Sequence, residues 1–210
     1  MVLTRVRPDW RWIALKALAH ALALLPLALL VRGVLHDTLG ADPVAAITHG
    51  TGDWALRLVV LGLAMTPLRR LLGQPWPIRF RRLLGLYAFF YATLHLATYV
   101  VLDLGQYWSQ LLDDIVKRPY ITVGFAAWLL LVPLALTSTR GWMRRLGRRW
   151  GQLHALVYAV GVLGVLHFLW LVKSDLREPL VYAGILALLL GLRLWWKLRR
   201  PAAQAPMRGA

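Results

Sequence analysis

The chain has 210 residues, of which 59% are hydrophobic, 11 are tryptophan and only 9 are acidic, a composition typical of integral membrane proteins. Its formal charge of +16 does not indicate nucleic-acid binding, because the basic residues separate apolar runs and do not cover a soluble face. The absence of cysteine excludes disulfides, iron–sulfur clusters, and thiolate-ligated or covalently attached haem, so any cofactor must be held by histidine, oxygen ligands or packing.

Six apolar runs follow one another, and each is predicted to span a membrane, because about 20 helical residues cross a bilayer core. The predicted fold is an all-α, six-helix transmembrane bundle. Its spans are residues 12–34, 52–68, 83–102, 121–136, 150–172 and 180–196. The bundle occupies residues 12–196, between an N-terminal segment 1–11 and a basic tail 197–210. The first run follows basic residues, as a signal peptide does, but it is too long for one and is predicted to be retained.

The segments between the spans contain one clear helix-start signal. Asp42 followed by Pro43 is predicted to begin a short interfacial helix that ends near Ile47. Residues 103–120 are predicted to form a loop. The sequence shows no convincing internal repeat.

The loop charges alternate along the chain. Lysine and arginine gather in residues 1–11, 69–82 and 137–149 and in the tail, whereas the other three loops hold most of the acidic residues. By the positive-inside rule, both termini are predicted to be cytoplasmic (N-in, C-in), and the three acidic loops are predicted to face the outside.

Two histidines are predicted to lie at the same depth. His95 in the third span is about 10 Å from the outer edge, and His167 in the fifth is about 8 Å from it. Two neutral imidazoles on facing helices can fill both axial positions of a haem iron, which gives a low-spin b-type centre suited to electron transfer. The alternative is that each histidine only hydrogen-bonds across helices, but a level pair of intramembrane ionisable residues favours haem.

Three further residues are candidates with open alternatives. His154 lies near the cytoplasmic end of the predicted span 150–172 and is rotated about 140° from His167, so it needs another partner. His20 in the first span is the candidate, although the two depths differ by about two turns. The alternative for His154 is an interfacial histidine near headgroups. Arg57 is level with the first pair and either binds a haem propionate or extends to the outer edge.

Other function classes lack their motifs. The sequence contains no HExxH, nucleophile elbow, Walker loop or Gly-rich dinucleotide motif. No acidic residue lies deep in a span, which disfavours a proton-coupled carrier. The remaining alternative is a small-solute transporter or channel in which the histidines form a polar pathway.

Several segments carry a family resemblance over about residues 5–200. They read RRLLGL (81–86), TLHL (93–96), GQLH (151–154), HFLW (167–170), LGADP (39–43) and KRPY (117–120). With them the chain resembles the MsrQ (YedZ) family of haem-binding membrane subunits, which belongs with the ferric-reductase-like transmembrane proteins.

The resemblance implies a bacterial inner-membrane subunit that is not an enzyme by itself. Such a subunit carries electrons from the quinone pool to MsrP, a periplasmic molybdopterin enzyme that reduces methionine sulfoxide in oxidised proteins. Family haem ligation maps onto His95, His154 and His167, which implies one haem b or two. FMN has also been associated with the family. The wider family pattern has two histidines in each of two helices, and here Arg82 stands near the fourth position.

Overall fold

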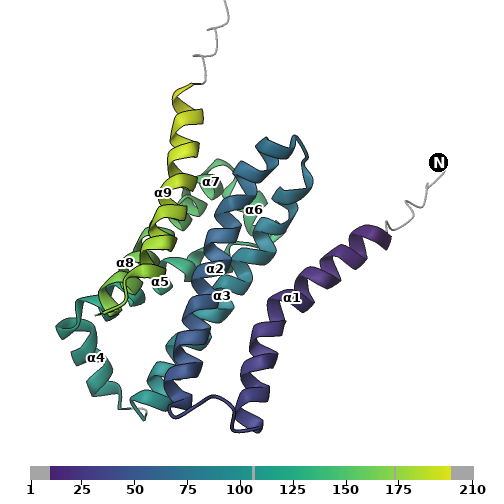
Figure 1. Cartoon of the computed structure of the whole chain (residues 1–210). Coiled ribbons are helices and arrows are strands. Elements are labelled where there is room, and N and C mark those ends of the chain that lie inside the picture. The colour runs from purple at the N-terminus through teal and green to yellow at the C-terminus, as the bar shows by residue number, and fades with distance from the viewer. Residues whose placement is uncertain (1–9, 106, 173, 200–210) are drawn as a thin grey trace, which may run out of the picture.

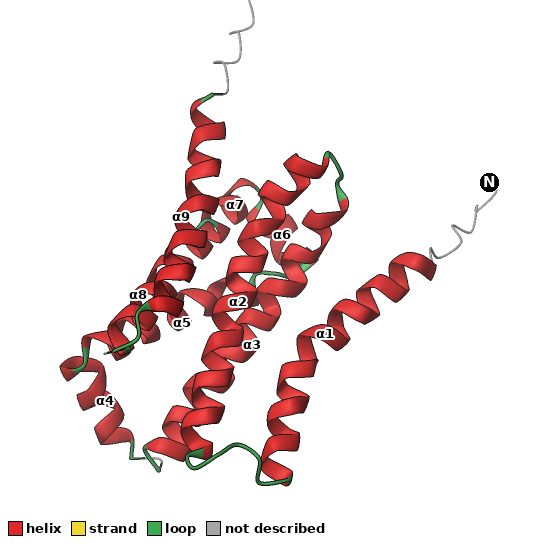
Figure 2. Cartoon of the chain, in the orientation of Figure 1, coloured by secondary structure: helices red, strands yellow, loops and turns green. Residues whose placement is uncertain are grey.

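The computed structural model describes residues 10–105, 107–172 and 174–199, and every regular element in these ranges is a helix (Figure 2). The α-helices are α1 (Trp10–Leu35), α2 (Pro43–Leu72), α3 (Arg81–Thr98), α4 (Trp108–Lys117), α5 (Pro119–Leu136), α6 (Arg140–Leu146), α7 (Arg148–His154), α8 (Leu156–Leu171) and α9 (Arg177–Leu198). A 3-10 turn, η1 (Trp76–Phe80), precedes α3, and a π-helical turn, η2 (Tyr99–Asp103), follows it.

Five helical stretches are long and apolar enough to cross a membrane. They are Trp10–Leu35, Trp76–Asp103, Pro119–Leu136, Arg148–Leu171 and Arg177–Leu198. These stretches correspond to five of the six predicted spans. The predicted span 52–68 lies within α2, which is helical for 30 residues but includes the charged Asp53 and Arg57. Because these charges lower its mean hydropathy, the crossing of the membrane by α2 stays a prediction.

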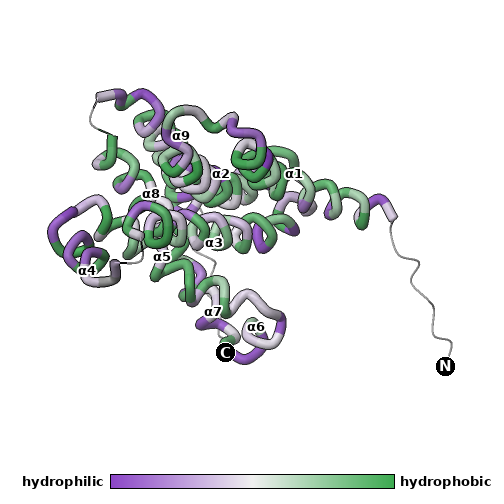
Figure 3. Tube along the Cα trace, turned by 90° about the horizontal axis from the view of Figure 1, so that it is seen from below, coloured by the Kyte–Doolittle hydropathy of each residue, from purple (hydrophilic) through white to green (hydrophobic). Residues whose placement is uncertain are grey.

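The outward surface of several helices is rich in leucine. Leu18, Leu22 and Leu29 of α1 are more than half exposed, and Leu188 of α9 is 62% exposed. Figure 3, a view along the bundle, shows hydrophobic residues predominating on α1, α5 and α8 and hydrophilic ones gathered on α4. A continuous apolar surface of this kind is stable against lipid but is an aggregation hazard in water.

Helix α2 begins as predicted but continues further. The side chain of Asp42 accepts a hydrogen bond from the N–H of Ala45 (2.9 Å), and Pro43 occupies the first helical position, which confirms the cap. The predicted end near Ile47 is wrong, because the helix runs on to Leu72. An isolated glycine weakens a helix without breaking it, so the glycines at 50 and 52 do not end α2.

Two predicted loops contain helices, and one predicted helix is interrupted. Residues 103–120 include α4, so the prediction of a loop there is wrong. In the basic segment 137–149, Thr139 caps α6 by accepting from the N–H of Trp142 (3.3 Å), and Gly147 ends α6 with a φ of 50°. The predicted helix 150–172 is divided at Ala155, whose N–H bonds to the carbonyl of Gln152 as in a tighter 3-10 turn.

Two helix pairs build the core. α2 packs along α3, and α5 packs along α8, while α9 lies against α2 and α8 (Figure 1). Buried side chains such as Leu58, Leu63 and Val160 fill the space between them. The N-terminal half of α1 diverges from the other helices in Figure 1, and an apolar cavity of about 650 Å³ lies between α1 and the α2–α3 pair.

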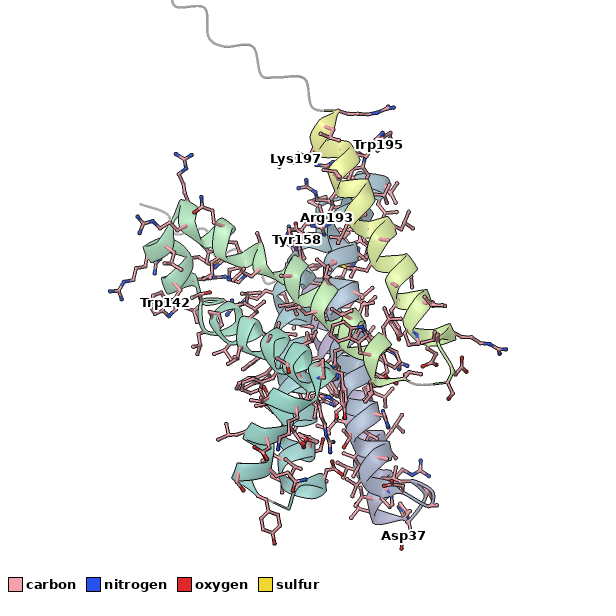
Figure 4. All side chains as sticks on the ribbon, turned by 90° about the vertical axis from the view of Figure 1, so that its left-hand side faces the viewer. Asp37, Trp142, Tyr158, Arg193, Trp195 and Lys197 are labelled. Carbon is pink, nitrogen blue, oxygen red and sulfur yellow. The ribbon has the colours of Figure 1, made fainter. Side chains whose placement is uncertain are left out.

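The charged segments separate to opposite ends of the bundle. The end of α9 and the connection between α2 and α3 lie at the upper end in Figure 1, and α4 and the α1–α2 turn lie at the lower end. Figure 4 shows the same separation, with Lys197 at one end and Asp37 at the other. The alternation of loop charge along the sequence therefore corresponds to two ends of the folded chain.

The kink of α1 is bridged by a side chain from α3. Pro26 lies inside α1 and disturbs its backbone hydrogen bonds, because proline has no N–H and its ring crowds the preceding turn. The hydroxyl of Tyr91 accepts a hydrogen bond from the N–H of Leu27 (3.2 Å) and donates one to the carbonyl of Ala23 (2.8 Å). Since Tyr91 is fully buried, this hydroxyl replaces one backbone bond and joins α1 to the core.

Substitution Tyr91→Phe is expected to lower the free energy of unfolding by about 1–3 kcal/mol, because it leaves a buried N–H and a buried carbonyl unpaired. The measurement is reversible unfolding in mixed detergent micelles. Tyr87→Phe is the matched control, since the Tyr87 hydroxyl bonds only to the exposed His20 (2.9 Å) and its loss should cost less. Equal destabilisation by the two substitutions would contradict the bridging role.

Candidate functional site

The histidines that the sequence places at one depth lie side by side in the structure. His95 is near the end of α3 and His167 near the end of α8, and their ring centres are 6.0 Å apart with the planes inclined at 79°. Both line a cavity of about 380 Å³ that is bounded by α2, α3, α5 and α8. The two helix pairs of the core thus each contribute one imidazole to a shared space.

A backbone carbonyl orients each ring. His95 Nδ1 lies 2.8 Å from the carbonyl oxygen of Thr48 on α2, and His167 Nδ1 lies 2.7 Å from that of Tyr120 on α5. A carbonyl can only accept, so Nδ1 of each ring donates, and Nε2 of the neutral imidazole keeps a free lone pair. This is the arrangement by which proteins orient a metal-binding histidine and increase its basicity.

A glycine makes room for each imidazole. A Cβ on Gly52 would lie 3.0 Å from the Cε1 and Nδ1 of His95, and a Cβ on Gly124 would lie 2.7 Å from the Nδ1 of His167. Each glycine is one helical turn after the carbonyl residue, Thr48 or Tyr120. The missing side chain lets the ring approach the carbonyl closely.

These contacts reveal an internal repeat that the sequence reasoning did not recognise. In both halves the histidine follows the carbonyl residue by 47 positions, and the glycine lies at the same place between them. Aligning the two halves on His95 and His167 would have shown the matching glycines Gly52 and Gly124. The signal was missed because the side chains around these positions differ between the halves.

The pair fits two axial ligands of one iron. Metal–imidazole bonds of about 2 Å put the two ring centres roughly 6 Å apart, as observed here. The wall next to the rings is apolar and is formed by Leu56, Val59, Leu131 and Val160. An apolar cavity with two free imidazole nitrogens suits a flat macrocycle that is held by its metal and by packing.

Arg57 does not reach this cavity. Its Nε donates to the hydroxyl of Tyr182 on α9 (2.9 Å), and its guanidinium lies 3.5 Å from the carboxylate of Asp53 and over the ring of Trp54. The preceding residue, Leu56, lines the cavity. Successive side chains on a helix are about 100° apart, so Arg57 faces away from the direction of Leu56. The predicted contact between Arg57 and a propionate is therefore not supported.

His20 and His154 are not brought together. In the described part of the chain, His20 Nδ1 bonds to the hydroxyl of Tyr87 on α3 (2.9 Å), and its side chain is exposed. His154 Nε2 bonds to the hydroxyl of Thr137 (3.1 Å), and its ring stacks on Trp150 with centres 4.0 Å apart. The structure does not support the candidate pairing of these two histidines, because His20 contacts α3 while His154 contacts the end of α5.

The mouth of the cavity holds charged residues that the sequence reasoning did not select. Asp42, Asp103 and the exposed His49 line it, and Arg118 is the one arginine among the described lining residues. Arg118 directly precedes α5, within the KRPY segment, and its Nε lies 3.0 Å from the carboxylate of Asp114. The segment that orients His167 through the Tyr120 carbonyl therefore also places a cation at the mouth.

The chain matches a family model and many named relatives. The model is described as "Ferric reductase like transmembrane component" and matches residues 51–165, which include His95 and His154 but end before His167. A protein of Xanthomonas axonopodis pv. citri (strain 306), named "Protein-methionine-sulfoxide reductase heme-binding subunit MsrQ", is 66% identical over 192 residues. That match covers 89% of this chain and 88% of the relative.

Two further relatives have the same printed name. One from Xanthomonas euvesicatoria pv. vesicatoria (strain 85-10) is 64% identical over 200 residues, with 91% of this chain and 92% of the relative covered. One from Ralstonia nicotianae (strain ATCC BAA-1114 / GMI1000) is 49% identical over 199 residues, with 93% and 91% covered. No solved structure matches the chain.

Proposed function

The chain belongs to the MsrQ family of haem-binding subunits, within the ferric-reductase-like transmembrane proteins, and on this premise we propose that it binds haem b and carries electrons across a membrane. The observation that carries the proposal is the pair His95 and His167, whose ring centres lie 6.0 Å apart in an apolar cavity. The lack of cysteine excludes covalently attached haem and thereby supports haem b.

The residues of the chain supply binding and orientation. Haem, when bound, supplies one-electron redox chemistry. His95 and His167 would hold its iron through Nε2, and the carbonyls of Thr48 and Tyr120 keep both rings in the tautomer that presents this atom. The apolar residues that line the cavity limit the access of water, which favours electron transfer over reaction with solvent.

The proposal includes a six-span topology with both termini in the cytoplasm. In it α2 is the sixth span, residues 12–196 form the haem-binding domain, and segments 1–11 and 197–210 are cytoplasmic. The arginine-rich segments at one end of the bundle support this orientation. The opposite end, with α4 and the mouth of the cavity, then faces the periplasm of a bacterial inner membrane.

The proposed electron donor is the quinone pool, and the proposed acceptor is the periplasmic molybdopterin subunit MsrP. The chain is then the electron-transfer subunit of a system that reduces methionine sulfoxide in oxidised proteins, and it has no catalytic site for that reaction. We assign one haem to His95 and His167. His154 stays a predicted ligand by family resemblance, and it would belong to a second haem; FMN is assigned no residues.

An absorption spectrum of the purified full chain tests the proposal. We expect the sharp bands of a low-spin haem with two histidine ligands, about one haem per chain, and reduction of this haem by a short-chain quinol. Dithionite reduction serves as the control for a haem that quinol cannot reach. A colourless protein would contradict the proposal and would favour the small-solute transporter or channel.

A further inference from the structure

Three side chains, Tyr99, Asp114 and Arg118, form a hydrogen-bonded network at the mouth of the cavity around a buried carboxylate, and we call them the Asp114 triad. Asp114 of α4 is only 6% exposed. Its carboxylate accepts a hydrogen bond from the hydroxyl of Tyr99 (2.5 Å) and pairs with the Nε of Arg118 (3.0 Å). A buried carboxylate is costly unless it is fully paired, so its presence here calls for a functional explanation.

Asp113, the residue before Asp114, shows how unusual the burial of the Asp114 carboxylate is. Asp113 and Lys117 form an ion pair of the same i,i+4 spacing on the same helix (2.7 Å), but both side chains are more than 60% exposed. An exposed pair of this kind contributes little to stability. The chain thus offers two neighbouring aspartates of α4 in ion pairs of the same spacing, one with a buried carboxylate and one with an exposed carboxylate.

The triad connects the elements that carry the two histidines. Tyr99 begins the π-helical turn η2, one helical turn after His95. Arg118 directly precedes α5, whose Tyr120 carbonyl orients His167. π-helical turns often occur at functional sites, because they redirect side chains within a helix. Tyr99 and Arg118 both line the cavity, whereas Asp114 lies behind them.

The guanidinium of Arg118 keeps donors for a ligand. Asp114 takes Nε and the hydroxyl of Tyr120 accepts from Nη1 (3.5 Å), but arginine has five N–H donors in a planar fork, so other terminal N–H groups remain for a second carboxylate. The acidic residues that line the cavity are Asp42, Asp53 and Asp103, and they repel a carboxylate, while the exposed His49 is the other basic side chain among the described lining residues. Arg118 is the one described lining residue whose planar fork can bind a carboxylate through two N–H groups.

We propose that Arg118 binds a carboxylate of the porphyrin and that Asp114, held by Tyr99, is the positioning residue that aims Arg118 into the cavity. This inference rests on the proposed function, because it assumes that haem enters between His95 and His167. It assigns the contact to Arg118 in place of Arg57.

The test compares haem with haem dimethyl ester, in which both carboxylates are neutral. The full chain, prepared free of haem, is titrated with each compound, and the ratio of the two dissociation constants is measured. We expect the wild type to prefer haem by roughly tenfold or more, as a charge-assisted hydrogen bond predicts. Arg118→Gln should abolish the preference, and Arg118→Lys should restore part of it.

Asp114→Asn, with Asp113→Asn as its matched control, tests the positioning role. Asp114→Asn should reduce the preference for haem over its ester and speed haem loss by about tenfold, whereas Asp113→Asn should change neither by more than about twofold. Thermal unfolding of the haem-free variants separates positioning from simple destabilisation. If Asp114→Asn does not fold, Tyr99→Phe, which removes one hydrogen bond to Asp114, tests the positioning role in its place. The Arg118 variants test the contact with the carboxylate directly.

The outcomes separate this inference from the proposed function. Wild-type protein that binds haem and its dimethyl ester equally well overturns the assignment of Arg118 and leaves the histidine pair in place. An unchanged preference in Arg118→Gln overturns it as well. Wild-type protein that binds neither compound overturns the proposed function itself.

Discussion

Replacing either His95 or His167 by alanine is expected to abolish the low-spin haem of the purified chain. Each alanine removes one of two axial ligands, while its partner ring stays oriented by the Thr48 or Tyr120 carbonyl. Loss of a group that only hydrogen-bonds to a metal ligand typically lowers metal affinity by about 10–100-fold, so loss of the ligand itself should lower the affinity more. We expect the haem content to fall below about a tenth of the wild-type value.

The measurement is an absorption spectrum with a haem-to-protein ratio for each variant. His20→Ala is the matched control, because His20 also lies in a membrane-spanning helix but bonds to Tyr87 away from the cavity. It should keep the wild-type spectrum. Free imidazole added to His167→Gly should restore a low-spin spectrum if the position is an axial one. A normal spectrum in His95→Ala or His167→Ala would refute the pairing.

Gly124→Ala is expected to have an effect almost as large, although it adds a single methyl group. The new Cβ would lie 2.7 Å from the Nδ1 of His167, which is closer than real Cβ contacts allow. Either the ring turns away from the Tyr120 carbonyl or α5 moves away from α8. Both changes displace Nε2, and we expect haem affinity to fall by about 10–100-fold.

Gly52→Ala should show the same effect in a milder form, since its Cβ would lie 3.0 Å from the His95 ring. Gly85→Ala in α3 is the control, because no atom lies within 4 Å of the added Cβ. Alanine favours a helix over glycine by about 1 kcal/mol, so haem-free Gly85→Ala should unfold no more easily than the wild type, whereas in Gly52→Ala and Gly124→Ala this gain offsets part of the cost of the clash. Wild-type haem affinity in Gly124→Ala would mean that His167 is not held as described.

The sequence contained enough information to predict that His95 and His167 lie at the same depth. Their depths follow from where the apolar runs begin and from the constant rise of a helix, which needs no tertiary contacts. The same local physics predicted the Asp42 cap and the start of α2 at Pro43, both of which the structure confirms. The comparisons confirm the family resemblance, which rested on short segments around these same residues.

Side-chain direction is where the sequence says least. Arg57 has the right depth for the cavity, but its azimuth on α2 directs it to Tyr182. The azimuth of His154 predicts neighbours other than those of His167, and the structure adds which they are, through the 3-10 turn at Ala155 and the bond to Thr137. Depth along a helix is a local quantity, whereas the direction in which a residue faces depends on which helices pack around it.

The amino-acid sequence by itself therefore determined the apolar runs, the separation of charge between the two ends and the common depth of His95 and His167, because composition and helical rise are properties of the chain alone. Only the tertiary structure decided which carbonyls orient the two rings, why Gly52 and Gly124 must lack a side chain, and how Asp114 pairs with Tyr99 and Arg118 beside the cavity. Those features arise from close approach between α2 and α3 and between α5 and α8, and such contacts join residues 47 positions apart.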